Sequence, residues 1–353
     1  MVRLKTHRIE LEAPGFPIRS LALLLGFCGL MLAGIARAAE STAAAVGPID
    51  HLLTMPYQPQ GPVEGTLRLA GSTTLQQAAA QWTAGFVRIH PKAVCELASR
   101  GSGAGWKSLA SAATDIALMS RPLTDAERTT YERETGRRIV AIVAAFDRMV
   151  WVVNATNPIE RLPWSPESGL LRSGAQPTAA TPADAVTAWG SLVADPAWAA
   201  VPIAVHGTSI DHGTRWHLDR LLTGTAACPI KVVEHETVAE VTEAVAADRG
   251  GLGLIGSNHG NWPGVKRIPL VVSADLQPMT DVVAGSARTP DCRPLFVVVT
   301  LPKEGGLSPL QREFLAYILS QAGQLDAAKD GLLPLSRSEI HAQRELLGWP
   351  VER

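Results

Sequence analysis

Charge of either sign is scarce in this sequence, and the charges that are present nearly cancel. Asp, Glu, Lys and Arg make up 18% of the 353 residues, and the formal net charge is −1. No run of Lys or Arg provides the basic surface that a nucleic-acid backbone requires, so the sequence argues against nucleic acid as a partner. Hydrophobic residues make up 46% of the chain, a share that is typical of folded proteins.

Metal-ligating patterns are also missing. The chain has four cysteines, and no two of them form a C-x-x-C pair, which argues against a structural zinc site and against a thioredoxin-like site. His206, His212 and His217 are close in sequence, but consecutive members lack the i, i+4 spacing of a helical metal site. We therefore predict no metal and no cofactor.

The sequence contains no recognisable catalytic motif. Gly101-Ser102-Gly103 is not the G-x-S-x-G nucleophile elbow, and no Ser, His and Asp stand out in a triad order. The same glycine-rich run lacks the ribose-binding acid expected about twenty residues after the start of a dinucleotide fingerprint. A hydrolase on an α/β scaffold would lack a nucleophile, and we predict that the chain is not an enzyme.

A targeting signal is present at the amino terminus. Basic residues precede the apolar stretch "LALLLGFCGLMLAGIA", and an Ala-Arg-Ala site ends at Ala38. These features predict a secretory signal at residues 1–38 that is cleaved after Ala38. The alternative is an uncleaved anchor, but a membrane span needs about 20 apolar residues. We expect a periplasmic or secreted protein in which residues 39–63, rich in Ala, Pro and Gln, form a linker.

After cleavage, Cys95, Cys228 and Cys292 remain. In an oxidising compartment an odd number leaves one thiol unpaired. Cys228 and Cys292 lie beside prolines at the ends of segments, so they are the candidate disulfide pair. Cys95 lies in the strand-like run "AVCELA", where a buried and inert thiol is expected.

Strand-like and helix-like segments alternate from Gly65 onward. "TLRLAG" alternates like a strand, and a helix over 75–90 follows the capping residues "STT" and ends before Pro91. The stretch 137–154 reads as two strands with a turn, and 308–331 as one or two amphipathic helices. This order predicts an α/β fold with mostly parallel, doubly wound sheets. Further strands are expected at 93–99, 115–120, 201–207, 230–235, 251–256 and 293–302, and further helices at 103–113, 214–224 and 237–248.

Each of three predicted helices begins with a similar polar loop. The loops are Gly71–Thr74, Gly101–Gly105 and Asp211–Thr214. A helix start presents unpaired N–H groups and the positive end of the helix dipole, while glycines allow close approach of a ligand to the backbone. Together, such loops would form an uncharged site for an oxyanion. Taken singly, each loop is also explained as an ordinary Ser or Thr cap.

Asp115 adds a carboxylate close to these loops in the sequence. A carboxylate beside an anion repels it unless it accepts a hydrogen bond from a ligand that carries a proton. Phosphate carries a proton at neutral pH and sulfate does not. The alternative is that Asp115 caps a turn before a strand.

In this order, the segments resemble those of the phosphate-binding solute receptors of bacterial ABC uptake systems (the PstS-like family). The resemblance runs from about Thr66 to Leu335 and implies a type II periplasmic-binding-protein fold, in which two doubly wound α/β lobes are joined by two crossing strands. We expect Phe146–Val153 and Leu295–Thr300 to cross, with lobe 1 formed by 64–147 plus 290–353 and lobe 2 by 148–289. The matching segments are "LRLAGSTTLQQAAAQW", "RGSGAGWKSL", "TDIALMSRPLTDAE", "AAFDRMVWVVNATNP", "TAWGSL", "DHGTRWHLDRLL", "GGLGLIG", "CRPLFVVVTLP" and "FLAYILSQAGQLDAAKDGLLPL".

The same resemblance implies which residues line the anion and where this chain departs from the family. Thr208 stands where the family usually has an Arg, and His212 where it has a Ser; Arg215 or a protonated His212 could compensate in part for the missing charge. The implied anion-binding residues are Thr73, Thr74 through its backbone, Ser102, Asp115, His212, Gly213 and Thr214.

The resemblance implies an exported, monomeric receptor for phosphate or a related tetrahedral oxyanion. Its partner would be an ABC permease at the inner membrane. The alternative, favoured by Thr208 and His212, is a drifted paralogue with a weakened anion site that acts in interaction, sensing or secretion.

Overall fold

The computed structural model describes residues 55–164, 187–223, 231–257, 262–272 and 289–350. The chain divides into two units, 1–51 and 52–353, and all described residues belong to the second. The predicted signal segment 1–38 lies outside the described residues. No helix in the described part is long and apolar enough to cross a membrane.

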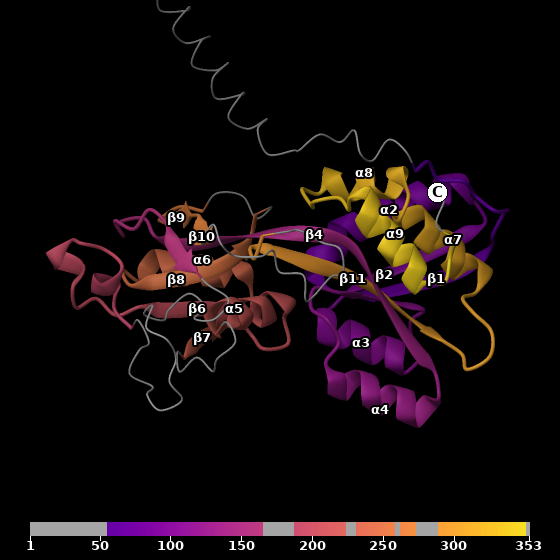
Figure 1. Cartoon of the computed structure of the whole chain (residues 1–353), viewed down its shortest axis with the longest axis horizontal. Helices are drawn as coiled ribbons and strands as arrows, with labels where there is room; N and C mark the ends of the chain where they lie inside the picture. The colour runs from indigo at the N-terminus through magenta and orange to yellow at the C-terminus, as the bar shows by residue number, and fades with distance from the viewer. Residues whose placement is uncertain (1–54, 165–186, 224–230, 258–261, 273–288, 351–353) are drawn as a thin grey trace, which may run out of the picture. The chain divides into compact units, whose positions relative to one another are not determined.

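The first lobe is built on parallel strands that each lead into a helix (Figure 1). β1 pairs in parallel with both β2 and β3, as the alternation predicts. β3 is buried along its whole length, as expected for a strand covered on both faces. The elements, in order, are β1 (Gly65–Gly71), η3 (Thr73–Leu75), α2 (Gln76–Ile89), β2 (Ala93–Ser99), α3 (Ser102–Ala110), β3 (Ile116–Met119) and α4 (Asp125–Thr135).

Two long antiparallel strands, β4 (Arg138–Asn154) and β11 (Cys292–Leu301), connect the lobes (Figure 1). The prediction of two strands and a turn in 137–154 is wrong, because β4 is continuous. Its first part pairs with β11, and its last residues pair with β8 and β9 of the second lobe. A single strand therefore has hydrogen-bonding partners along its entire length and needs no turn.

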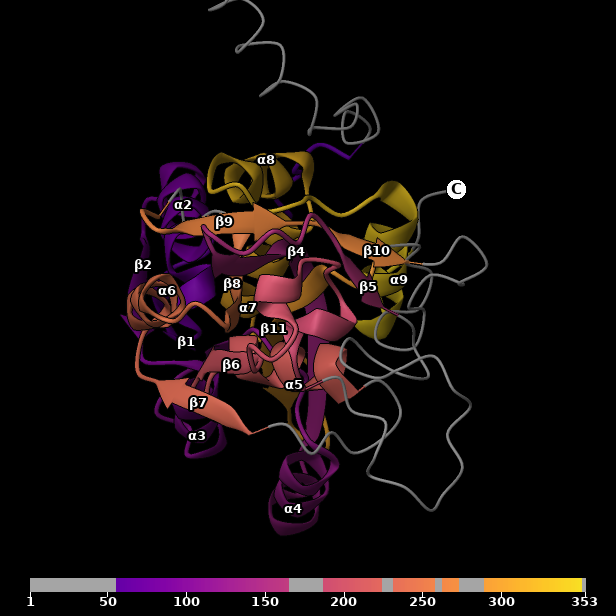
Figure 2. The ribbon, with the colours of Figure 1, turned by 90° about the vertical axis from the view of Figure 1, so that its left-hand side faces the viewer.

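The second lobe repeats the parallel arrangement. β6 pairs in parallel with β7 and β8 (Figure 2). Nine of the described strands form one sheet in the order β2-β1-β3-β11-β4-β8-β6-β7, with β9 on β4, and β5 and β10 form a separate two-stranded sheet. The elements are β5 (Leu162–Trp164), η5 (Trp189–Ser191), η6 (Pro196–Trp198), β6 (Ala204–Thr208), α5 (Gly213–Thr223), β7 (Val232–His235), α6 (Val238–Ala247), β8 (Gly251–Gly256), β9 (Val265–Ile268) and β10 (Leu270–Val272).

The chain ends with helices that pack on the first lobe. The predicted helical stretch 308–331 is two helices, α7 (Pro309–Ile318) and α8 (Gln321–Lys329), followed by α9 (Arg337–Leu346). Ser320 separates the first two, since its hydroxyl caps the start of α8 by accepting from the N–H of Gly323.

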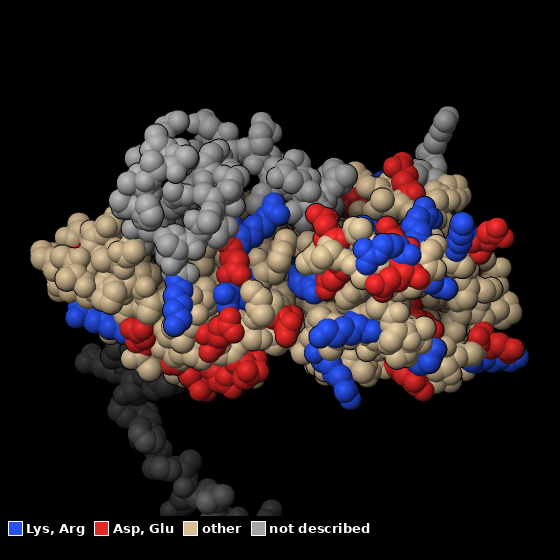
Figure 3. Space-filling view, turned by 90° about the horizontal axis from the view of Figure 1, so that it is seen from below, with Lys and Arg blue, Asp and Glu red and all other residues tan. Residues whose placement is uncertain are grey.

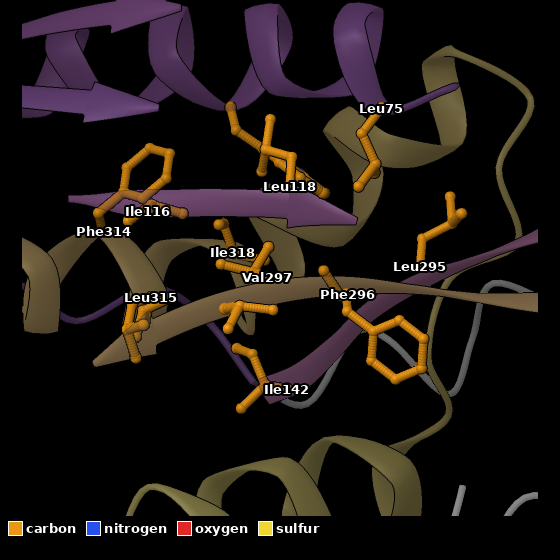
Figure 4. Close-up of a cluster of buried hydrophobic side chains, with 14 of the residues drawn as sticks. Leu75, Ile116, Leu118, Ile142, Leu295, Phe296, Val297, Phe314, Leu315 and Ile318 are labelled. Carbon is orange, nitrogen blue, oxygen red and sulfur yellow. The ribbon is translucent and has the colours of Figure 1, made fainter. Parts of the chain in front are cut away.

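The buried hydrophobic side chains separate near the connecting strands. One cluster takes its members from residues 67–146 and 292–349, and the others from 149–268. In Figure 4, side chains of β3, β4 and β11, including Leu118, Ile142 and Val297, pack with Phe314 and Ile318 of α7. This separation supports the division at about residues 147 and 290, which remains a proposal.

Part of the predicted linker is not a free spacer. The Tyr57 hydroxyl donates to Oε2 of Glu313 on α7 at 2.6 Å and lies 2.7 Å from Nε2 of His90. The N–H of Gln60 donates to Oε1 of Glu313 at 3.0 Å. Residues from Tyr57 onward are therefore held against the first lobe.

The cysteines are only partly covered by the structure. Cys228 lies outside the described residues, so its pairing with Cys292 stays a prediction. Cys95 carries a free thiol that is half-buried rather than fully buried. Burial raises the pKa of the Cys95 thiol to about 11, which favours the protonated and less nucleophilic form near neutral pH.

Candidate functional site

A cavity of about 650 Å³ lies at the carboxyl ends of parallel strands from both lobes. Ser72 follows β1, Ser120 follows β3, and Thr208 is the last residue of β6. Ligands of doubly wound sheets bind outside the carboxyl ends of the strands, so this is where a site is expected. The lining residues are Ser72, Thr73, Thr74, Gln77, Gly101, Ser102, Ser120, Thr208, His212, Gly213, Thr214, Glu236, Thr237, Val238, Ala239, Trp262 and Asp330.

The structure brings together the predicted loops. Apart from Asp115, every residue that the sequence suggested for the anion lines this cavity: Thr73, Thr74, Ser102, His212, Gly213 and Thr214. The side chain of Ser102 is buried, while Thr73 is exposed. Their proximity is a finding, and their role in binding stays a prediction.

Asp115 does not reach the cavity, which corrects the sequence prediction. It immediately precedes β3, whereas Ser120 follows the other end of that strand. Its carboxylate instead accepts from the N–H of Arg68 at 2.8 Å and from the Arg68 guanidinium at 3.2 Å. These donors belong to the neighbouring strand β1 and not to a local turn, so the alternative of a turn cap is not what the structure shows either.

Three serines from three separate loops meet at the base of the cavity. The hydroxyl of Ser72 donates to Oγ of Ser120 at 2.9 Å, and Oγ of Ser102 lies 3.1 Å from Oγ of Ser120. The N–H of Ser120 also donates to Oγ of Ser102 at 3.0 Å. Each of these serines is at most 3% exposed. They form a buried cluster of hydroxyl groups that can donate to or accept from a ligand.

Ser120 was missed at the sequence level. The prediction took the residue that precedes the strand "IALM", Asp115, instead of the residue that follows it. The signal was available, because Ser72 and Ser120 occupy equivalent positions after parallel strands.

Several helices begin at the cavity wall. Ser72 caps η3 by accepting from the N–H of Thr74 at 3.2 Å, α3 begins at Ser102, and α5 begins at Gly213. Gly101 precedes α3 with a φ of 89°, a left-handed conformation that favours glycine. The amino-terminal ends of these helices carry partial positive charge, so the wall attracts an anion without a formal cation.

A buried ion pair lies beneath this wall. Arg293 of β11 donates from Nη2 to Oδ2 of Asp147 on β4 at 2.5 Å, and both side chains are 1% exposed. The same guanidinium donates to Oγ1 of Thr214 at 2.9 Å and to Oγ1 of Thr74 at 3.2 Å. Arg293 was not predicted, since its partners are far away in the sequence.

The cavity also contains carboxyl groups. Asp330, at the end of α8, and Glu236, after β7, both line it. Burial raises the pKa of Asp330, and the negative charge of Asp147 raises it further. A hydrogen bond from the backbone of Ala78 opposes this rise. Asp330 Oδ2 is buried and has no hydrogen-bond partner among the described residues. In the described part of the chain, no cluster of His, Cys, Asp and Glu is suited to a metal ion.

Thr208, which the resemblance places where the family usually has an Arg, is a small residue without a charge. Thr208 is 2% exposed, and its Oγ1 has no hydrogen-bond partner in the described part of the chain. Arg215 does not compensate, because its guanidinium is paired with Asp219 at 2.7 Å and with Glu234 at 2.6 Å. Among the described residues that line the cavity, none is Lys or Arg.

A family model described as a PBP superfamily domain matches residues 56–322, which is most of the chain. The chain belongs to this superfamily. Its fold is α/β and of the type II periplasmic-binding-protein kind, as predicted from the order of motifs. The superfamily domain covers β1 to α7, and therefore includes the strand ends and helix starts that line the cavity.

Named relatives within this superfamily cover most of the chain. The phosphate-binding protein PstS of Pseudomonas aeruginosa is 27% identical over 300 residues, which are 84% of this chain and 91% of the relative. Protein SphX of Synechococcus elongatus is 24% identical over 239 residues, or 67% of each protein. An ABC-type phosphate transport receptor from Vibrio cholerae superposes with a TM-score of 0.52 at 21% identity, covering 77% of this chain and all of that chain.

Proposed function

We propose that this protein is an exported solute receptor that binds phosphate or a related tetrahedral oxyanion in the cavity between its lobes. The observation that carries the proposal is the meeting of Ser72, Ser102 and Ser120 with the amino-terminal ends of helices in one cavity. Hydroxyl and backbone N–H groups are the donors that a tetrahedral anion accepts from, and helix termini supply favourable potential.

The relatives support the chemical class of the ligand. PstS of Pseudomonas aeruginosa is named a phosphate-binding protein and matches 84% of this chain. A binding protein needs no nucleophile and no resident cofactor, in keeping with the sequence and with the hydroxyl groups found in the cavity. The proposal is therefore a receptor and not an enzyme.

Asp330 takes over the role that the sequence assigned to Asp115. A half-buried carboxyl in an anion site can accept a hydrogen bond from a protonated oxyanion, but it repels one that is fully ionised. Hydrogen phosphate and hydrogen arsenate carry a proton at neutral pH, while sulfate does not. We propose that Asp330 provides this discrimination.

Transport remains part of the proposal. The predicted signal at residues 1–38 would export the chain, and an ABC permease at the inner membrane would accept the ligand from a monomeric receptor. β4 and β11 join the lobes and would act as the hinge on which they close around the anion. The closed form would then be the one that the permease recognises.

A second function is favoured by the departures from the family pattern. With Thr208 in place of an Arg, and His212 in place of a Ser, the described residues of the lining include no Lys or Arg that could contact the ligand directly. A paralogue whose anion site has weakened, and which acts in interaction, sensing or secretion, would have the same fold. This alternative predicts that no tetrahedral anion binds.

Equilibrium dialysis of the mature chain with radiolabelled phosphate separates the two proposals. The receptor proposal predicts saturable binding that unlabelled phosphate and arsenate abolish and that sulfate leaves largely intact. Binding that fails to saturate would favour the drifted paralogue. Equal competition by sulfate would leave the receptor in place but would remove the proposed role of Asp330.

A further inference from the structure

Arg293 contacts both walls of the cavity without lining it. Its guanidinium is 1% exposed and bonds Thr74, which follows β1 of the first lobe, and Thr214, in the first turn of α5 in the second lobe. Asp147 holds the same guanidinium from β4. Both threonines line the cavity. A single threonine side chain, Thr74 in one lobe and Thr214 in the other, thus separates Arg293 from the proposed ligand.

The direction of these hydrogen bonds determines what the threonines can do. A guanidinium has only donors, so the Oγ1 atoms of Thr74 and Thr214 must act as acceptors toward Arg293. Each threonine hydroxyl keeps its own hydrogen, which is then free to point into the cavity. Held in this way, both hydroxyls present donors, and donors are what a fully or partly ionised oxyanion requires.

We propose that Arg293 is the positioning residue of the anion site, an inference that rests on the proposed function. It sets the hydroxyls of Thr74 and Thr214 as donors and places a formal positive charge directly behind them. This charge stands in for the cation that Thr208 cannot supply. Because the two threonines belong to different lobes, Arg293 also favours the arrangement in which both walls face the same ligand.

A purely structural role for the Arg293–Asp147 pair is the competing explanation. A buried ion pair can often be replaced by apolar residues of similar volume without loss of stability. Such a role accounts for the bond to Asp147 but not for the bonds to Thr74 and Thr214, which lie 219 and 79 residues away in sequence. The two explanations differ in whether the energetic effect of Thr74 depends on Arg293.

A double-mutant cycle measured by phosphate binding tests this dependence. Thr74→Val removes the hydroxyl at constant shape, and Thr74→Ser is the matched control that keeps it. Each is made in the wild type and in the Asp147→Leu/Arg293→Met background, which replaces the whole pair and leaves no buried charge behind. Thermal melting and circular dichroism confirm that each variant is folded before inorganic phosphate is titrated by calorimetry.

We expect Thr74→Val to weaken phosphate binding at least tenfold in the wild type and less than threefold once the pair is replaced. We also expect Arg293→Lys to fold but to lose at least tenfold in affinity, because one ammonium group cannot reproduce the forked contacts to both threonines. Equal losses in both backgrounds, or wild-type affinity in Arg293→Lys, would overturn the positioning role while leaving the receptor function intact. If the wild type binds no phosphate at all, the proposed function and this inference fail together.

Discussion

The backbone of Gly213 in the second lobe lies directly against Ser120 of the first. A Cβ atom at position 213 would overlap both the Oγ atom and the carbonyl group of Ser120. The start of α5 and the serine cluster therefore approach each other as closely as a glycine allows.

Gly213→Ala should consequently weaken phosphate binding by at least tenfold. The added methyl group must push α5 away from Ser120 and so separate the two walls of the cavity. Gly306→Ala is the matched control, because a Cβ atom there has no neighbour within 4 Å. Calorimetric titration of both variants checks this, and unchanged affinity in Gly213→Ala would contradict the observed approach of the two walls.

Asp330→Asn should reduce the discrimination between phosphate and sulfate. An amide can donate to a fully ionised oxygen, which the carboxylate cannot do. Asp115→Asn is the matched control. It should change neither the phosphate affinity nor the sulfate affinity, since Asp115 pairs with Arg68 and does not line the cavity.

The pH dependence of sulfate binding provides a second test of Asp330. The pKa of Asp330 is raised by burial, so lowering the pH protonates it earlier than an ordinary carboxyl group and turns it into a donor. Sulfate affinity should therefore rise as the pH falls through this raised pKa. In Asp330→Asn that rise should be absent, and its persistence would assign the effect to another group.

Thr208→Arg should raise phosphate affinity about tenfold or more. The substitution restores a cation at a position that lines the cavity, and a guanidinium can form paired hydrogen bonds with an oxyanion. Thr208→Gln, which adds length without charge, is the control. A loss of binding in both variants would mean that the buried site cannot accommodate a longer side chain.

His217 should make the folded protein sensitive to acid. Burial, and then the positive charges of Arg293 and Arg220, lower the pKa of His217 to about 3. A hydrogen bond to the Pro290 carbonyl partly opposes this shift. Between pH 6.5 and about 3 the unfolded chain therefore binds a proton that the folded chain does not. Stability contributed by the neutral imidazole is present above pH 6.5 and declines as the pH falls.

Urea denaturation at a series of pH values checks this prediction for His217. The free energy of unfolding should fall by up to about 1.4 kcal/mol per pH unit from this group alone. His217→Gln should remove that part of the slope, while the carboxyl groups common to both proteins contribute equally. Identical slopes in the two proteins would show that His217 is not buried in its neutral form.

The alternation of strand-like and helix-like segments predicted most of the parallel strands and the helices between them, while the two-lobe arrangement was implied only by the family resemblance. Strands β1 and β6, and helices α2, α5 and α6, fall within a few residues of the predicted ranges, because each has an apolar face and a clear start or end. α4 was missed since only Tyr131 is buried along it, which leaves no apolar stripe to recognise. The turn predicted in 137–154 does not exist. It was predicted because the local sequence pattern does not reveal that one continuous strand pairs with strands of both lobes.

The candidate site was predicted where it depends on local loops and missed where it depends on distant contacts. Thr73, Ser102 and Gly213 each begin or precede a helix, which a sequence can indicate. The buried Arg293 contacts Thr74 and Thr214, which are brought near it only by folding. The spacing of these residues in the sequence does not indicate the contacts. Charges that lie on the central strands are identified by structure alone.

Charges of both signs are mixed on the described part of the face seen in Figure 3. Lys and Arg side chains lie among Asp and Glu side chains there, in keeping with the near-zero net charge of the sequence. A mixed surface of this kind gives no long-range attraction for a polyanion.

Calorimetric titration of inorganic phosphate into the wild type and into Ser102→Ala/Ser120→Ala tests the central claim most directly. The wild type should bind one phosphate per chain. Loss of the two buried hydroxyls should weaken binding by about 2–6 kcal/mol, taking about 1–3 kcal/mol for each hydrogen bond to a charged oxygen. Ser111→Ala, on the exposed end of α3, should bind like the wild type. Phosphate binding of equal strength in all three proteins would contradict the site, and no binding to the wild type would contradict the function.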